Sequence, residues 1–420
     1  MYNNLFKTGG HVTVTRGAVL LPCGYMNKVK VVHIITKMEL GGAQQNTLYT
    51  VSHLNPEKFQ ACLITGPGGE LYEEALSLGN TIVAQDLVRE VRPLQDVKAF
   101  FQLCRMLKAI KDTPPCGAPV IVHTHSSKAG ILGRWAAWRS AVPIIIHSIH
   151  GFGFHDHQPW LIRNFYIFLE KLASRITTRF IAVSQANREL GCRLHLFTAE
   201  RAAVIRSGID IPQFQHRQIT KEGFRAALGI PPAAPVVAMI ACLKPQKAPL
   251  DFIRVCDLVR NAFPGAHYIL AGDGELRGAV EQEIEKRDLQ QHVHLLGWRQ
   301  DIAQLLQAID VLVLTSLWEG LPRVFPQAMA ARVPVVATRV DGAPEAIADG
   351  VNGFLLAPGD LPGIARQIIF LLKNPLEARS MGQRGAGMVA EFDIKKMMQQ
   401  QEALYEELLA GAGSPEPHKT

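Results

Sequence analysis

The sequence has 420 residues, of which 48% are hydrophobic, and its net charge at pH 7 is +7. This length exceeds the size at which one hydrophobic core usually keeps growing, so we expect two domains of ordinary size. No apolar run approaches the roughly 18 residues that a membrane-spanning helix needs, so the composition favours a soluble or peripheral protein over a transmembrane one.

The positive charge is concentrated in the first half of the chain. Residues 1–210 contain 23 Lys and Arg against 14 Asp and Glu, a net charge of +9, whereas the remainder carries −2. The basic half suits an anionic partner. Because no basic run is interleaved with aromatic residues, we expect no nucleic-acid partner.

Residues 1–27 precede the first convincing strand and lack the basic, apolar and small-residue order of a cleavable signal. We expect them to be a disordered or mis-started extension, with the native chain beginning at Met26. A native but loosely held arm is an equally consistent interpretation.

From Lys30 onward, short runs rich in Val and Ile alternate with stretches of helical periodicity. The runs predict strands in the first half at residues 30–36, 61–66, 80–85, 119–125, 142–148 and 179–184. After a polar, proline-containing segment, a second series follows at residues 235–243, 266–272, 292–298, 310–316, 334–338 and 353–358. This alternation favours parallel sheets with helices on both faces.

The pattern therefore predicts an α/β protein with two doubly wound Rossmann-like domains facing a cleft. We place the N-terminal domain at residues 28–207 and the C-terminal domain at 208–393. A helix at 394–410 follows, for which a return to the N-terminal domain is one option, and the polar residues 411–420 should be disordered. In open sheets of this kind, ligands bind beyond the carboxyl ends of the strands, so we expect the site in the cleft.

Two pairs of residues at predicted strand ends suit phosphate binding. Gly41 and Gly42, between the first strand and a helix, let backbone N–H groups approach a phosphate, although a tight turn without a ligand explains paired glycines equally well. Lys244 and Lys247 follow the first strand of the second domain, where two ammonium groups suit a diphosphate. The alternative for this pair is a solvated basic loop.

Glu319 and Gln327 follow the predicted strand at 310–316 and are eight residues apart. Two turns of helix would separate them by about 12 Å at 1.5 Å per residue. A carboxylate accepts hydrogen bonds from sugar hydroxyls, and an amide both accepts and donates. The pair predicts a ligand that crosses a helix N-terminus, with phosphate over the amides and a sugar at either end.

Together the motifs resemble the family 4 retaining glycosyltransferases of GT-B architecture, of the kind found in capsule and exopolysaccharide synthesis. The donor-binding signature of that family is matched by Glu319-Gly320-Leu321, then QAMA from Gln327, VPVVAT, DGAPEAI and DGVNGFLL. Further landmarks in the family's order are ELGGAQQ, HTHSSKAG, IHGFGFH, IAVS, RSGID, LKPQKAP, LAGDGEL and LGWRQD. The resemblance covers about residues 28–410 and is more specific for the family than for the substrate.

This resemblance implies transfer from a nucleoside-diphosphate sugar with retention of anomeric configuration, without a metal or another cofactor. Glu319 matches the acid that contacts the donor sugar, Gln327 the residue that holds the ribose, and Lys247 the lysine on the diphosphate. Gly42 matches a glycine beside the diphosphate, and His150 a histidine beside the transferred sugar. We therefore expect Glu319, His150 and Lys247 to be catalytic, and Gly41, Gly42, Lys244, Lys247, Gly320, Leu321, Arg323 and Gln327 to bind the donor.

Three positions depart from the family pattern, since Gln327, Cys242 and Arg332 stand where Glu, Arg and Gly are usual. An amide still hydrogen-bonds ribose hydroxyls, at a loss of about 1 kcal/mol. A thiol cannot replace a guanidinium, so we expect Lys244 to stand in if the strand continues to it. Arg332 should be strained in a left-handed helix terminus.

Several polar residues of the first domain are candidates for contact with the acceptor: His125, Ser126, Lys128 and His155. His123 and His125 alternate at a strand end, and we expect one to face the core and the other the cleft. Four histidines occur within eleven residues, at positions 147, 150, 155 and 157. The glycines between them argue against a converging metal site.

The segment 159–180 combines apolar and basic side chains at helical spacing. The apolar residues are Trp160, Leu161, Phe165, Phe168, Leu169 and Leu172, and the basic ones are Arg163, Lys171, Arg175 and Arg179. One interpretation is a core helix with a solvated basic face. The other is a surface that docks on anionic lipid, which would hold a cytoplasmic protein at the inner face of the cell membrane.

We therefore expect a glycosyltransferase that moves a sugar from a nucleotide donor to a lipid-linked glycan of a cell-surface polysaccharide. The departures at Cys242 and Gln327 leave open a catalytically silent relative that acts as an assembly partner. A nucleotide-sugar epimerase of the same architecture is a second alternative.

Overall fold

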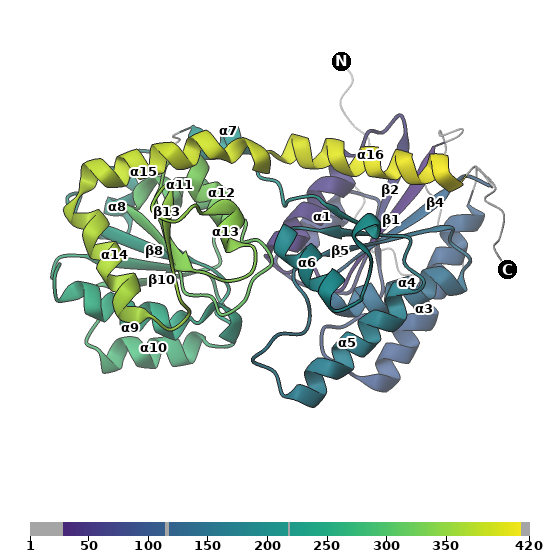
Figure 1. The fold of residues 1–420 in the computed structure, drawn as a ribbon, viewed down its shortest axis with the longest axis horizontal. Coiled ribbons are helices and arrows are strands. Elements are labelled where there is room, and N and C mark those ends of the chain that lie inside the picture. Colours follow the sequence, from purple (N-terminus) through teal and green to yellow (C-terminus); the bar gives the residue numbers. More distant parts are fainter. Residues whose placement is uncertain (1–27, 114–116, 217–218, 413–420) are drawn as a thin grey trace, which may run out of the picture.

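The computed structural model describes residues 28–113, 117–216 and 219–412. Two α/β domains lie side by side, each built on one parallel sheet (Figure 1). This arrangement confirms the predicted fold class. The expectations for residues 1–27, and for the tail beyond residue 412, lie outside the described residues.

The N-terminal sheet is built from β1 (Val29–Ile35), β2 (Phe59–Thr65), β3 (Thr81–Val83), β4 (Val120–His125), β5 (Ile144–Ile149), β6 (Arg179–Ala182) and β7 (Ala202–Val204). Their order in the sheet is β3-β2-β1-β4-β5-β6-β7, with every pair parallel. The prediction missed β7.

The remaining elements of this domain are α1 (Gly42–His53), α2 (Tyr72–Ser77), α3 (Pro93–Asp112), α4 (Ser127–Arg139), α5 (Trp160–Ser174), α6 (Gln185–Arg193) and the 3-10 helix η1 (Ala199–Arg201). Strands buried on both faces need helices on both sides. One face packs against α3 and α4 through residues such as Leu103 and Ala136. The opposite face is covered in part by the last helix of the chain.

The C-terminal sheet is built from β8 (Val236–Ile240), β9 (His267–Ala271), β10 (Val293–Gly297), β11 (Val311–Leu314), β12 (Val335–Thr338) and β13 (Gly353–Leu356). Its order is β10-β9-β8-β11-β12-β13, again parallel. The helical elements are α7 (Ile211–Gln215), α8 (Lys221–Ala227), η2 (Pro245–Lys247), α9 (Pro249–Arg260), α10 (Arg277–Lys286), α11 (Ile302–Ala308), α12 (Val324–Ala330), α13 (Ala343–Ala346), α14 (Leu361–Lys373), α15 (Pro375–Met388) and η3 (Val389–Phe392).

The last helix, α16 (Ile394–Ala412), leaves the C-terminal domain and runs over the N-terminal one (Figure 1). Met397, Leu404 and Tyr405 are buried there in one cluster with β1, β4 and β5. Glu406 of this helix also forms an ion pair with Lys58 of the N-terminal domain, at 2.6 Å. The helix extends to Ala412, two residues beyond its predicted end at residue 410.

The amphipathic segment forms α5, but its first half is not core. The exposed fractions are 72% for Trp160, 73% for Leu161, 57% for Phe165 and 55% for Phe168. The core-helix interpretation is therefore wrong for these four side chains. Arg179, which the spacing placed on the helix, lies in β6 and pairs with Glu407 of α16.

No helix in the described ranges is long and apolar enough to cross a membrane.

Candidate functional site

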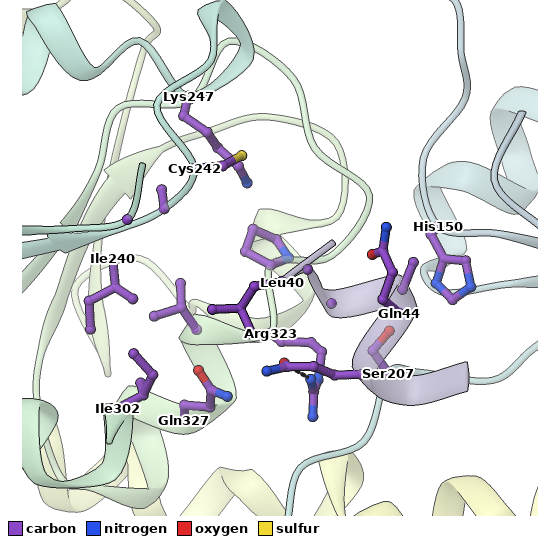
Figure 2. Close-up of a pocket in the computed structure, with 18 of the residues that line it drawn as sticks. Leu40, Gln44, His150, Ser207, Ile240, Cys242, Lys247, Ile302, Arg323 and Gln327 are labelled. Atoms are coloured by element: carbon purple, nitrogen blue, oxygen red, sulfur yellow. Dashed lines mark hydrogen bonds between the residues drawn. The ribbon is translucent and has the colours of Figure 1, made fainter. Parts of the chain in front are cut away.

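A cavity of about 330 Å³ lies between the domains, at the carboxyl ends of strands from both sheets. Figure 2 shows Lys247, Cys242 and Gln327 on one side of it, and Gln44 and His150 on the other. Of the predicted residues, the cavity brings together Gly41, Gly42, His150, Lys247, Glu319, Gly320, Leu321, Arg323 and Gln327. The loops converge because parallel strands present their carboxyl ends at one edge.

Glu319 and Lys247 form an ion pair in this cavity. Glu319 lies in the loop after β11 with 8% exposure, and its carboxylate accepts a hydrogen bond from the Lys247 ammonium. The Glu319 backbone N–H donates to Asp341 Oδ2 at 2.6 Å, which fixes the loop. Thr315 Oγ1 donates to the Lys247 carbonyl at 3.0 Å and holds η2 beside β11. A buried carboxylate is tolerated when paired in this way.

The backbone between Glu319 and Gln327 differs from the prediction. Because α12 begins at Val324, only the second half of the interval is helical, and the expected two turns are not formed. Both side chains nevertheless line the same cavity. Within the described ranges the Gln327 amide makes no protein hydrogen bond, so it is available to a ligand.

Arg323 places a guanidinium between the two domains. It donates to the Gly208 carbonyl at 3.1 Å and to the Gln45 side-chain oxygen on α1. No carboxylate of the described chain forms an ion pair with it, and burial lowers the pKa of Arg323 to about 10, so it stays charged at neutral pH. A Cβ on Gly42 would lie 3.1 Å from Arg323 Cδ, so this glycine lets α1 approach the arginine closely.

The structure does not bring Lys244 into the cavity. The prediction assumed that the strand continues past Cys242, whereas β8 ends at Ile240. Lys244 instead lines a neighbouring pocket, where its ammonium lies 3.3 Å from Glu39 of the other domain. Cys242 does line the main cavity, so the expected substitution of Lys244 for an arginine at that position lacks its geometric basis.

The four acceptor-side candidates point in different directions. His125 is buried and shares a hydrogen bond of 3.1 Å with His150. Ser126 bonds Thr36 at 2.8 Å, and Lys128 pairs with Asp96 on α3. His155 stacks on Trp318 of the opposite domain, with ring centroids 3.7 Å apart. Among these four, only His125 connects directly to a residue that lines the cavity.

Two further expectations concern backbone and strand geometry. His123 and His125 are both buried on one face of β4, so the prediction that one of them faces the cleft is wrong. Residues two apart on a strand share a face. Arg332 has φ 61, which confirms the left-handed conformation expected after α12.

Sequence reasoning missed His33, Gln45 and Trp318. Each of them contacts a site residue that is far away in sequence: His33 bonds His125, Gln45 bonds Arg323, and Trp318 stacks on His155. Local periodicity carries no signal for such pairs. For His33, the only clue is its place in the strand beside β4.

Two family models match the chain: Glycosyltransferase Family 4 over residues 40–213 and Glycosyl transferases group 1 over residues 220–388. A relative from Escherichia coli, UDP-Gal:alpha-D-GlcNAc-diphosphoundecaprenol alpha-1,3-galactosyltransferase, is 30% identical over 346 residues, 82% of this chain and 88% of the relative. The chain belongs to the family 4 glycosyltransferases. It is a nucleotide-sugar-dependent glycosyltransferase, as its motif order predicted.

This glycosyltransferase has other relatives of similar length. The N,N'-diacetylbacillosaminyl-diphospho-undecaprenol alpha-1,3-N-acetylgalactosaminyltransferase of Campylobacter jejuni is 25% identical, over 82% of this chain and 90% of the relative. The crystal structure of Anabaena HepE in complex with UDP and glucose superposes with a TM-score of 0.77 at 22% identity, over 90% of this chain and 99% of HepE. That likeness shows the two-domain GT-B fold.

Proposed function

We propose that the enzyme transfers a sugar, with retention of anomeric configuration, from a uridine-diphosphate sugar to a glycan carried on a lipid diphosphate. The observation that carries the proposal is the ion pair between the buried Glu319 and the partly buried Lys247, in a cavity that also holds Arg323 and Gln327. The names of the Escherichia coli relative and of the HepE complex support uridine diphosphate as the leaving group. Retention rests on the family signature around Glu319.

The proposed chemistry follows from the charges in the cavity. Positive charge at Lys247 and Arg323 stabilises a departing diphosphate, where negative charge grows in the transition state. Glu319 accepts hydrogen bonds from hydroxyls of the transferred sugar, which becomes oxocarbenium-like. Gln327 holds the ribose. Because two side-chain cations are already in place, we assign charge neutralisation to them rather than to a metal.

The proposed acceptor is an undecaprenyl-type lipid diphosphate bearing a sugar. The names of the Escherichia coli and Campylobacter jejuni relatives both describe such acceptors. The exposed apolar half of α5 supports the same proposal, because an enzyme acting on a lipid-linked glycan must work at a membrane surface. We propose that the enzyme lies peripherally on anionic lipid through this helix, on the inner face of the cell membrane.

A donor screen with purified enzyme tests the proposal. We expect binding and slow hydrolysis of a uridine-diphosphate hexose or N-acetylhexosamine. Failure of uridine, guanosine and adenosine diphosphate sugars to bind would favour the catalytically silent alternative. Conversion of the donor to its epimer without an acceptor would favour the epimerase.

Variants of the two signature residues test their roles separately. Glu319→Gln keeps the shape but removes the charge beside the reacting sugar, so kcat should fall at least tenfold while UDP affinity is kept. Gln327→Ala should mainly raise the donor KM, because the ribose changes little during reaction. Steady-state kinetics beside UDP titrations check both expectations. An unchanged kcat in Glu319→Gln would contradict the assignment.

A further inference from the structure

A hydrogen-bonded row of three histidines connects the cavity to the interior of the N-terminal domain. His33 Nδ1 and His125 Nε2 are 2.9 Å apart, and His125 Nδ1 and His150 Nε2 are 3.1 Å apart. The strand register explains the first contact, because His33 of β1 pairs with His123 of β4, and His125 follows two residues later on the same face. His150 is the member that lines the cavity.

All three rings are neutral at physiological pH. Burial lowers the pKa of His33 to about 3 and that of His125 well below its usual value. Burial, with the nearby charge of Arg323, lowers the pKa of His150 to about 4. A neutral imidazole has one N–H donor and one acceptor nitrogen. Two hydrogen bonds in series therefore force the three rings to donate in the same direction.

The inner end of the row decides between the two directions. His33 Nε2 is buried and has no hydrogen-bond partner among the described residues. If the row donated inward, this nitrogen would carry an unpaired buried N–H. If it donates outward, the same nitrogen carries only an unpaired lone pair. Orphaned buried donors are rarer than under-used acceptors, so the outward direction is favoured.

We propose that His125 is a positioning residue that holds His150 in the tautomer protonated at Nδ1. His33 Nδ1–H then donates to His125 Nε2, and His125 Nδ1–H donates to His150 Nε2. The remaining nitrogen of His150, Nδ1, has no protein partner within the described ranges and carries a proton. His150 thus offers the cavity a hydrogen-bond donor and not a general base.

The consequence for catalysis rests on the proposed function, whereas the tautomer does not. An N–H at this position donates to an oxygen of the donor sugar or its phosphate. His150 cannot remove a proton from an acceptor hydroxyl, because the lone pair of its other nitrogen, Nε2, accepts the hydrogen bond from His125. The structure assigns binding of the donor to His150 and leaves proton removal to another group.

A buried metal site is the competing explanation for these histidines. Ring nitrogens of His33, His123 and His125 lie within 4.8 Å of one another. Both nitrogens of His123 are already engaged, by Tyr405 at 2.6 Å and Ser148 at 2.7 Å. Both nitrogens of His125 are engaged within the row. A metal would have to break these bonds, so hydrogen bonding is favoured.

Imidazole 15N spectra of the full-length enzyme, labelled with 15N-histidine, test the tautomer directly. A His150→Gln variant identifies the signals of His150. We expect the wild-type ring to be protonated at Nδ1. A wild-type ring protonated at Nε2 would overturn the proposal without any activity measurement, and so would one equivalent of zinc in the purified protein bound through His33 and His125.

A matched pair of variants on β4 tests the role of His125. His125→Leu removes the donor to His150, so the Nδ1–H preference should be lost, and kcat should fall about three- to tenfold, as expected for one hydrogen bond, with UDP affinity kept. His123→Leu removes an equally buried histidine on the same face without touching His150, so it should change neither readout. Tyr405→Phe replaces this control if His123→Leu melts at a lower temperature. An unchanged His150 tautomer in folded His125→Leu would overturn the proposal.

Discussion

At the level of single residues, the cavity gathers cations around one carboxylate. Lys247 is paired with Glu319, and Arg299 donates to Asp301 at 2.8 Å. Arg323 has no acidic partner in the described part of the chain. An arriving diphosphate would therefore gain a charge-assisted contact at Arg323 without breaking an ion pair.

The family usually has an arginine where this chain has Cys242, and Arg323 and Lys244 are two candidates to take over its role. Variants of these two residues distinguish between them. Arg323→Gln should weaken UDP binding at least tenfold, because a charge-assisted hydrogen bond contributes about 1.5–3 kcal/mol. Lys244→Gln removes a cation of the neighbouring pocket and should change UDP affinity less than threefold. Calorimetric titration measures both. Equal losses of UDP affinity in the two variants would return Lys244 to the donor site. Recovery of UDP affinity in Arg323→Gln/Cys242→Arg would support the idea that Arg323 supplies the charge that the family usually has at position 242.

At the level of elements, α3 and α5 expose apolar side chains in their first halves. On α3, Leu94 is 85% exposed and Phe101 58%; on α5, Trp160 is 72% exposed. Both helices extend to the lower edge of the N-terminal domain in Figure 1. Exposed aromatic and aliphatic residues beside basic ones are typical of a surface that inserts into the lipid interface.

Charge reversal at the C-terminal end of α5 tests membrane attachment. Lys171→Glu/Arg175→Glu should weaken binding to vesicles containing anionic lipid, by roughly 1 kcal/mol for each basic residue near the surface. The matched control, Arg366→Glu/Lys373→Glu, reverses two exposed charges on α14 of the other domain and should have little effect. Sedimentation with vesicles at two salt concentrations measures the difference. Equal binding to neutral and anionic vesicles would contradict the proposal.

At the level of the whole molecule, ion pairs join the two domains. Arg206 and Glu345 pair at 2.9 Å, and Lys244 and Glu39 at 3.3 Å. The helix α16 covers the N-terminal sheet and brings Tyr405 onto His123. The stability of the N-terminal domain is thus coupled to a cluster of buried neutral histidines.

Acid should destabilise the protein through these histidines. Burial lowers the pKa of His33 to about 3, and the pKa values of His123, His125 and His147 well below 6.5. As pH falls below about 6.5, these histidines bind protons in the unfolded chain but stay neutral in the folded protein. The free energy of unfolding therefore decreases. Each histidine contributes at most about 1.4 kcal/mol per pH unit. Urea unfolding between pH 7.5 and 5 measures the slope; His33→Leu should flatten it, and stability that rises toward pH 5 would contradict the expectation.

The sequence by itself determined the fold class, twelve of the strands, and the position of Lys247, Glu319 and Gln327 at strand ends that meet at one cavity, whereas His150 was implied only by the family resemblance. These features depend on local apolar periodicity and on the general rule that parallel strands end at one edge. Motif order along the chain then identified the family. Tertiary contacts were not needed for any of these conclusions.

Only the tertiary structure decided which side chains act as partners. The end of β8 at Ile240 turns Lys244 toward Glu39, the register of β1 on β4 places His33 beside His125, and domain placement sets Arg323 against Gln45. The tertiary structure also decided the exposure of α5, because an amphipathic pattern is the same whether the apolar face of a helix packs against a core or lies in solvent. Each outcome depends on contacts between residues far apart in the chain, and local periodicity carries no information about those contacts.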